Sequence, residues 1–220
     1  MASSFQDDDR ENEMRELFNL YKDENEGRSG IDAYLDIDGH TIPFELKTTS
    51  NGSVTTVRDF SPEHIKKWKN KHWLIGFHLD AETYYKYGSP SMMEEWILGK
   101  GEYIAPDFQL ANIIPSKLNL KELYKILGKK GKYSYEDAKL IQKKQYLKTK
   151  YEELQDLKNG YSPNRMLEIL KDRAKYLMER GSTLNNPHIP HSYFKGWTEI
   201  TDNHAEQLRS MVRTYIAELD

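Results

Sequence analysis

One stretch of the chain constrains the fold more than any other: residues 29–50, SGIDAYLDIDGHTIPFELKTTS. Two runs of alternating polar and apolar residues flank Asp38 and Gly39, a pair typical of the two-residue turn of a β-hairpin. If these two residues form the turn, the numbers of directly opposed residues sum to 77. The sequence therefore predicts a hairpin that places Asp32 directly across from Glu45.

The two faces of this hairpin differ in chemical character. The apolar face consists of Ile31, Ala33, Leu35, Ile37, Ile42, Phe44 and Leu46. The polar face carries Asp32, Glu45 and Lys47, with Asp36 further along as a peripheral group. Two directly opposed carboxylates repel each other, and a divalent cation such as Mg²⁺, which prefers oxygen ligands, would relieve that repulsion. A neighbouring ammonium could orient or deprotonate a water molecule, or hold a phosphate, so this face is suited to phosphodiester cleavage.

The spacing of these residues is similar to that of a known family. Asp32, twelve intervening residues and then Glu45-Leu46-Lys47 resembles the PD-(D/E)XK nuclease superfamily, and FELKTTSNGSVTTVRDFSPEHIKKWKNKHWLIGFH resembles type II restriction endonucleases. The resemblance covers residues 10–80. It implies that Asp32, Glu45 and the Leu46 carbonyl bind one or two Mg²⁺ ions and that Lys47 serves the attacking water. The implied products are a 5′-phosphate and a 3′-hydroxyl.

The first helix is expected over residues 10–21, where Met14, Leu17, Phe18 and Tyr21 form one apolar stripe. The resemblance implies a further acid from this helix, for which Glu13 is the candidate and Glu16 the alternative. The chain also departs from the family pattern, because Ile31 stands where the motif has proline. Residues 22–30 are too polar to offer the strand that the superfamily has before the Asp-bearing one.

Residues suited to contacting a nucleic-acid backbone follow the second strand of the hairpin. These are Thr48, Thr49, Ser50, Ser53, Thr55, Thr56 and Arg58, followed by Lys66 and Lys67 on the next expected helix. Hydroxyls and basic side chains position phosphate groups. A solvated loop and a charged outer helix face are the alternative interpretations of the same residues.

The remaining patterns predict an α/β fold with a mixed central sheet flanked by helices, which by resemblance is restriction-endonuclease-like. Ser61-Pro62-Glu63 begins a helix that should end near Lys71 or His72, and WLIGFHL is then a buried strand parallel to the hairpin's second strand. From residue 107 helices dominate. Their start signals are Asn119, Ser134 and Ser162, and their stop signals are Gly128, Gly160 and Gly181. We therefore expect a catalytic core over residues 1–106 and a helical elaboration for DNA binding or dimerisation over 107–220.

Charge and composition narrow the class of protein. The chain has no cysteine, which excludes disulfides and thiolate metal sites. Its net charge is −3, but residues 117–150 hold eleven Lys and Arg against three Asp and Glu, either a nucleic-acid footprint or a solvated helix face. With no secretory apolar region and no apolar run long enough to span a membrane, we expect a soluble, cytoplasmic protein without a membrane partner.

The expected function is a Mg²⁺-dependent endodeoxyribonuclease, specifically a type II restriction endonuclease. By resemblance its partners are double-stranded DNA, a second copy of the chain in a homodimer and a cognate DNA methyltransferase. A repair or junction nuclease of the same superfamily and a non-catalytic DNA-binding protein are the alternatives. Asp137 followed by Asp156-Leu157-Lys158 also matches the motif, but in a helical stretch where these residues would not share a strand face. His188 and His191 are interpreted as a loop pair.

Overall fold

The structure, a computed structural model, describes residues 4–26, 30–57, 60–79, 82–143, 145–182 and 187–219. The chain divides into two units: a sheet unit, residues 1–102 with 185–220, and a helical unit, residues 103–184. The first boundary lies near the expected one. The C-terminal segment differs from expectation, because it returns to the sheet unit and adds two short strands, a 3₁₀ helix and an α-helix to it.

The predicted hairpin forms one edge of the sheet. Its strands are β1 (Ala33–Ile37) and β2 (His40–Thr49). The register pairs Ile37 with His40 and Leu35 with Ile42, as the sequence predicts. Asp38 and Gly39 have φ angles of 49° and 83°, and two consecutive residues in the left-handed region make the type I′ turn that suits a right-twisted hairpin.

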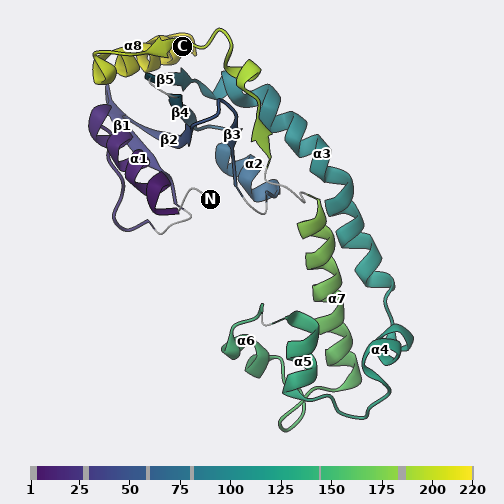
Figure 1. Ribbon diagram of the computed structural model, residues 1–220. Coiled ribbons are helices and arrows are strands. Elements are labelled where there is room, and N and C mark those ends of the chain that lie inside the picture. Colours follow the sequence, from purple (N-terminus) through teal and green to yellow (C-terminus); the bar gives the residue numbers. More distant parts are fainter. Residues whose placement is uncertain are drawn as a thin grey trace. The chain divides into compact units, whose positions relative to one another are not determined.

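Three further strands complete the main sheet. They are β4 (His72–Leu79), β5 (Glu82–Gly88) and β7 (Glu199–Ile200), in the order β1-β2-β4-β5-β7. As predicted, β4 runs parallel to β2, after the intervening helix α2 (Pro62–Trp68). This helix ends earlier than expected, because His72 already pairs with Phe44 in the sheet. The mixed sheet with flanking helices confirms the predicted α/β fold class (Figure 1).

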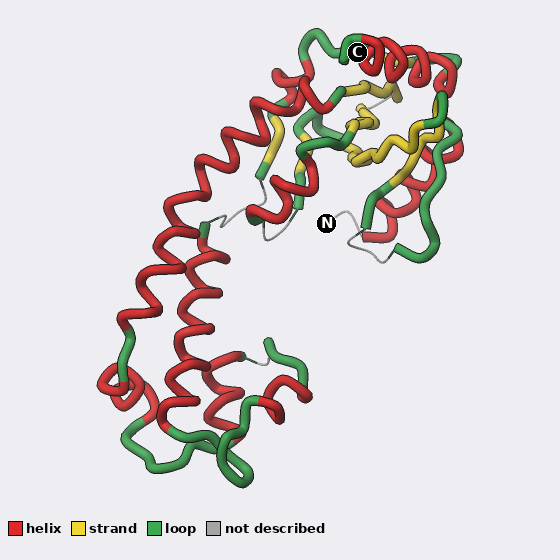
Figure 2. The backbone as a smooth tube through the Cα atoms, turned by 180° about the vertical axis from the view of Figure 1, so that it is seen from behind, coloured by secondary structure: helices red, strands yellow, loops and turns green. Residues whose placement is uncertain are grey.

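Helices cover both faces of the sheet (Figures 1 and 2). The helices α1 (Ser4–Leu17) and α8 (His204–Ala217) pack on the face that carries Leu46 and Leu74, through Met14, Phe18, Leu208 and Val212. On the other face an aromatic cluster joins α2 and the start of α3 to β4: the ring centroids of Trp68 lie 5.2 Å from Trp73 and 6.1 Å from Trp96. These two layers hold the polar edge of the hairpin in place.

The helical unit has its own core. It contains the end of α3 (Pro90–Lys117) and the helices α4 (Leu120–Leu127), α5 (Tyr135–Gln142), α6 (Lys148–Glu153) and α7 (Pro163–Gly181). The predicted N-caps are confirmed, because the side chains of Asn119, Ser134 and Ser162 each accept a backbone hydrogen bond. Gly128 ends α4, but Gly160 follows a turn beyond α6 and ends no helix. No helix in the described ranges has the length and apolar character that crossing a membrane requires.

Candidate active site

Asp32, Glu45 and Lys47 lie together, as the hairpin register predicts. The ammonium Nζ of Lys47 is 3.2 Å from Asp32 Oδ2 and 2.9 Å from Glu45 Oε1. It also donates a hydrogen bond of 2.7 Å to the backbone carbonyl of Leu46. The two strand residues share a face because side chains two positions apart on a strand point the same way. A single cation is thus surrounded by three oxygen atoms from the two hairpin segments.

Backbone contacts position Asp32, which precedes β1 and makes no ladder pair of its own. Leu46 donates its backbone N–H to Asp32 Oδ2 at 3.1 Å, and Arg15 of α1 donates to the Asp32 carbonyl at 2.9 Å. The carboxylate is therefore held from the strand and the main chain is held from the helix. This double attachment gives the side chain a defined orientation without regular strand pairing.

A second lysine, to which the hairpin pattern assigns no role, completes the ion cluster. Lys71, between α2 and β4, donates to Glu45 Oε2 at 2.5 Å and is only 2% exposed. The sequence signal for this role is the position of Lys71 directly before a buried strand that runs parallel to β2. A lysine buried at such a position needs a carboxylate partner. Glu45, itself 3% exposed, therefore has one lysine on each carboxylate oxygen.

The charges of this cluster stabilise one another. Burial by itself would raise the pKa of Glu45, but Lys47 and Lys71 outweigh it and lower the pKa to about 2. Burial would likewise lower the pKa of Lys47, but Glu45, Asp32 and Glu11 raise it above that of a free lysine. At neutral pH the buried carboxylate is therefore ionised and Lys47 is an ammonium. In this state Lys47 can donate hydrogen bonds but cannot accept a proton.

Glu11, rather than Glu13, is the acid that α1 brings to the cluster. Glu13 is exposed and its charge acts on His78 and Tyr85, whereas Glu11 faces Lys47. Burial raises the pKa of Glu11 from 4.5 to about 7; Lys47 opposes this shift and Asp32 adds to it. Met14 and Phe18 of the predicted apolar stripe are buried, but the helix begins earlier than expected and ends at Leu17, and Tyr21 pairs with Tyr34 beyond it. The choice between acids two residues apart depends on how the helix is rotated against the sheet.

The raised pKa of Glu11 predicts a pH dependence of stability. In the unfolded chain Glu11 ionises near pH 4.5, but in the fold it ionises only near 7. Between these values ionisation of Glu11 stabilises the unfolded state but not the folded state. The wild type therefore loses stability as the pH rises through this window. We expect the melting temperature of Glu11→Gln to rise relative to wild type from pH 4.5 to 7 and to keep a constant lead above it. A constant difference over pH 4–9 in thermal melts would contradict the shift.

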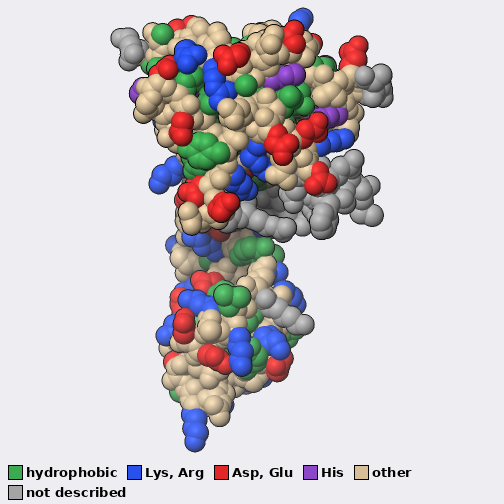
Figure 3. Space-filling view, turned by 90° about the vertical axis from the view of Figure 1, so that its left-hand side faces the viewer, with side chains coloured by type: hydrophobic (Ala, Val, Ile, Leu, Met, Phe, Trp, Pro, Cys, Tyr) green, Lys and Arg blue, Asp and Glu red, His purple; other side chains and the backbone are tan. Residues whose placement is uncertain are grey.

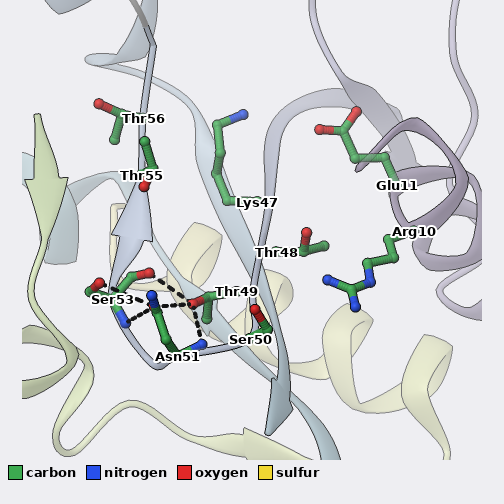
Figure 4. A pocket seen from close by; sticks show the side chains of 10 residues that line it. All are labelled: Arg10, Glu11, Lys47, Thr48, Thr49, Ser50, Asn51, Ser53, Thr55 and Thr56. Atoms are coloured by element: carbon green, nitrogen blue, oxygen red, sulfur yellow. Dashed lines mark hydrogen bonds between the residues drawn. The ribbon is translucent and has the colours of Figure 1, made fainter. Parts of the chain in front are cut away.

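A pocket of about 410 Å³ opens beside Lys47 (Figure 4). It is lined by Arg10, Glu11, Lys47, Thr48, Thr49, Ser50, Asn51, Ser53, Thr55 and Thr56. Figure 4 shows Lys47 between Arg10 and Glu11 on one side and, on the other, Thr55 of β3 (Val54–Thr55) and the adjacent Thr56. Six of the nine residues predicted to contact DNA line this pocket.

Several hydroxyl groups around this pocket already donate their hydrogen bonds to protein atoms. Thr49 donates to the Ser53 carbonyl at 2.8 Å, Ser53 donates to the Asn51 side chain at 3.2 Å, and Thr56 donates to the Pro187 carbonyl at 2.7 Å. Phosphate oxygens only accept hydrogen bonds, so these three hydroxyls shape the loop rather than offer donors. The basic side chains Arg10 and Lys47 are the charged donors on the pocket wall.

The other predicted DNA contacts lie elsewhere. Lys66 is exposed on α2. Lys67 donates to the Gly30 carbonyl, and its pKa is lowered by burial and by Lys71. It therefore belongs to the surroundings of the ion cluster. Arg58 lies outside the residues that the structure describes.

Several sequence features have structural roles instead. Asp36 is exposed and accepts hydrogen bonds from Tyr21 and Thr41, outside the ion cluster. In the second motif match, Asp137 caps α5 and Asp156 binds Ser162 at the start of α7. The expected loop pair at residues 188 and 191 belongs to β6 (His188–Ile189), which pairs with β3, and to the 3₁₀ helix η1 (His191–Phe194).

The oxygen atoms around Lys47 Nζ suit a divalent cation. Asp32 Oδ2, Glu45 Oε1 and the Leu46 carbonyl converge within 3.2 Å of one positive charge. Two carboxylates and a carbonyl are hard oxygen donors of the kind Mg²⁺ takes together with water molecules. No metal site built from three or more His, Cys, Asp or Glu side chains is found in the described part of the chain, so the main-chain carbonyl is needed to complete this set.

Comparison with protein-family models, with curated proteins and with solved structures finds no match for this chain.

Proposed function

We propose that this protein is a Mg²⁺-dependent endodeoxyribonuclease of the PD-(D/E)XK type, and specifically a type II restriction endonuclease. One observation carries the proposal: Asp32 Oδ2, Glu45 Oε1 and the Leu46 carbonyl surround a single cationic point beside a pocket with basic walls. These are the atoms that the motif assigns to the metal. An ordinary surface hairpin does not need a buried carboxylate held by two lysines.

The proposed reaction is hydrolysis of a phosphodiester. The oxygen of a water molecule bonds to phosphorus and the water gives up a proton to solvent. The bond from phosphorus to the 3′ oxygen breaks, and that oxygen takes a proton from solvent, which leaves a 5′-phosphate and a 3′-hydroxyl. Asp32, Glu45 and the Leu46 carbonyl would hold Mg²⁺, which supplies charge stabilisation at the departing oxygen. Lys47, an ammonium at neutral pH, orients the water and donates to a phosphate oxygen. Its raised pKa favours this orienting role over the alternative in which it takes the proton.

The proposed substrate is double-stranded DNA. Arg10 and Lys47 line the pocket and can contact a phosphate. The helical unit has seventeen Lys and Arg against ten Asp and Glu, which favours a polyanionic partner. Acidic and basic side chains are interspersed on the face shown in Figure 3, so phosphate groups would contact individual basic side chains there rather than a continuous basic surface. Two copies would match the two DNA strands, and a cognate methyltransferase would protect cytoplasmic host DNA.

The test is incubation of the purified protein with a sequenced plasmid and Mg²⁺. Discrete fragments with 5′-phosphate ends are the expected result. A smear would indicate a non-specific nuclease, and cutting confined to branched DNA would indicate a junction nuclease, in each case with the same fold. Intact DNA together with DNA binding would indicate a non-catalytic binding protein.

Asp32→Ala is expected to abolish cation binding. The substitution removes one of the three converging oxygens and also the acceptor for Leu46 N–H and Lys47 Nζ. Calorimetric titration with Ca²⁺ in the absence of DNA should show binding by wild type and none by the variant. Asp36→Ala is the matched control, since this exposed carboxylate is on the same hairpin but outside the cluster. Equal Ca²⁺ binding by wild type and Asp32→Ala would contradict the site.

A further inference from the structure

Lys71 contacts one carboxylate oxygen of Glu45, and the proposed mechanism gives this lysine no role. Its ammonium is 2.5 Å from Glu45 Oε2, whereas Lys47 and the converging oxygens are on the side of Oε1. At 2% exposure Lys71 cannot reach a substrate. The segment that carries it is also fixed, because Lys71 donates its backbone N–H to the Trp68 carbonyl and His72 pairs with Phe44.

The two lysines therefore differ in what they can do. Lys47 is partly exposed and lines the open pocket, so it has space to move away from Glu45. Lys71 is enclosed between α2 and β4 and has no such space. When Lys47 leaves Oε1, Lys71 still provides Oε2 with a donor and a compensating charge. Only one oxygen of Glu45 then faces the cation position.

We infer that Lys71 is a positioning residue that restricts Glu45 to a single coordinating oxygen and thereby selects Mg²⁺ over Ca²⁺. The inference rests on the proposed function. Mg²⁺ requires near-octahedral geometry and usually takes one oxygen from each carboxylate, whereas Ca²⁺ accepts six to eight oxygens and readily takes both oxygens of one carboxylate. A lysine fixed on Oε2 removes the two-oxygen arrangement, which costs Ca²⁺ more than Mg²⁺.

The test compares the two metals rather than activity. Calorimetry without DNA gives the ratio of the Mg²⁺ and Ca²⁺ dissociation constants for wild type, Lys71→Met and Lys71→Arg. In Lys71→Met the freed Oε2 should shift this ratio toward Ca²⁺ by about tenfold or more. Lys71→Arg retains a charged donor to Oε2, so its ratio should return to within about threefold of wild type.

A purely structural role would weaken the binding of both metals alike, and an unchanged ratio in Lys71→Met would overturn the inference. A wild type that binds neither metal would instead overturn the proposed function. A second measurement needs no variant. Infrared difference spectra of wild type labelled with ¹³C at its Glu carboxylates, taken on Ca²⁺ addition, should show the widely split stretching bands of one-oxygen coordination. Narrowly split bands, which indicate two-oxygen coordination, would refute the inference about Lys71, whether or not the variants fold.

Discussion

Lys47→Met is expected to lose cleavage by about 10²–10³-fold while still binding divalent cations, because removing one hydrogen-bond donor aimed at charge that develops in the transition state costs about that much in rate. The substitution keeps the length and apolar volume of the side chain but removes the ammonium that contacts Asp32 and Glu45. Lys71 remains on Glu45, so the carboxylate keeps a counter-charge. Since the same ammonium occupies the cation position in the structure, its removal should leave Ca²⁺ binding at least as tight as in wild type.

The two readouts, plasmid cleavage and Ca²⁺ calorimetry, separate a catalytic role from a structural one. Lys86→Met is a suitable control, because Lys86 is a largely buried lysine of β5 that pairs with Glu199 outside the cluster. It should cleave and bind Ca²⁺ as wild type does. Cleavage by Lys47→Met within about tenfold of wild type would show that this lysine does not serve the reaction, since a hydrogen-bond donor of this kind contributes more than that.

Glu45→Gln is expected to have the largest effect on stability. It removes the carboxylate that pairs with Lys71, which is 2% exposed, and also takes one partner from Lys47. Breaking a buried ion pair from one side leaves an uncompensated buried charge and costs about 3–5 kcal/mol. The free energy of unfolding in urea should fall by that amount, and Ca²⁺ binding should be lost with the negative charge of the carboxylate.

A double variant identifies the origin of that loss. In Glu45→Gln combined with Lys71→Met, the buried uncompensated charge of Lys71 is gone. Part of the unfolding free energy should therefore return although Ca²⁺ binding does not. Asp38→Asn is the matched control, since its carboxylate is an exposed partner of Arg213 at 2.8 Å and, because solvent screens such pairs, its loss should change stability far less than Glu45→Gln does. A double variant less stable than Glu45→Gln alone would show that the cost does not come from the unpaired lysine.

Local patterns in the sequence determined the hairpin and its active face. Asp38 and Gly39 can both adopt positive φ, so the turn type and the register follow from two residues. That register places Glu45 and Lys47 on one face and brings Asp32 opposite them. The helix starts at Asn119, Ser134 and Ser162 could be predicted for the same reason, since a cap depends on contacts within four residues.

Contacts between distant segments decided the rest of the site. Lys71 reaches Glu45 only because β4 pairs with β2, 26 residues away in sequence, and Glu11 faces Lys47 only because of how α1 is rotated against the sheet. Residues 185–220 join the sheet unit through pairing of β7 with β5, which no local signal indicates. The sequence by itself determined the turn, the register and the three motif residues, whose interactions are short in range. Only the tertiary structure decided which further charges surround them, because burial and ion pairing depend on segments that come together when the whole sheet unit packs.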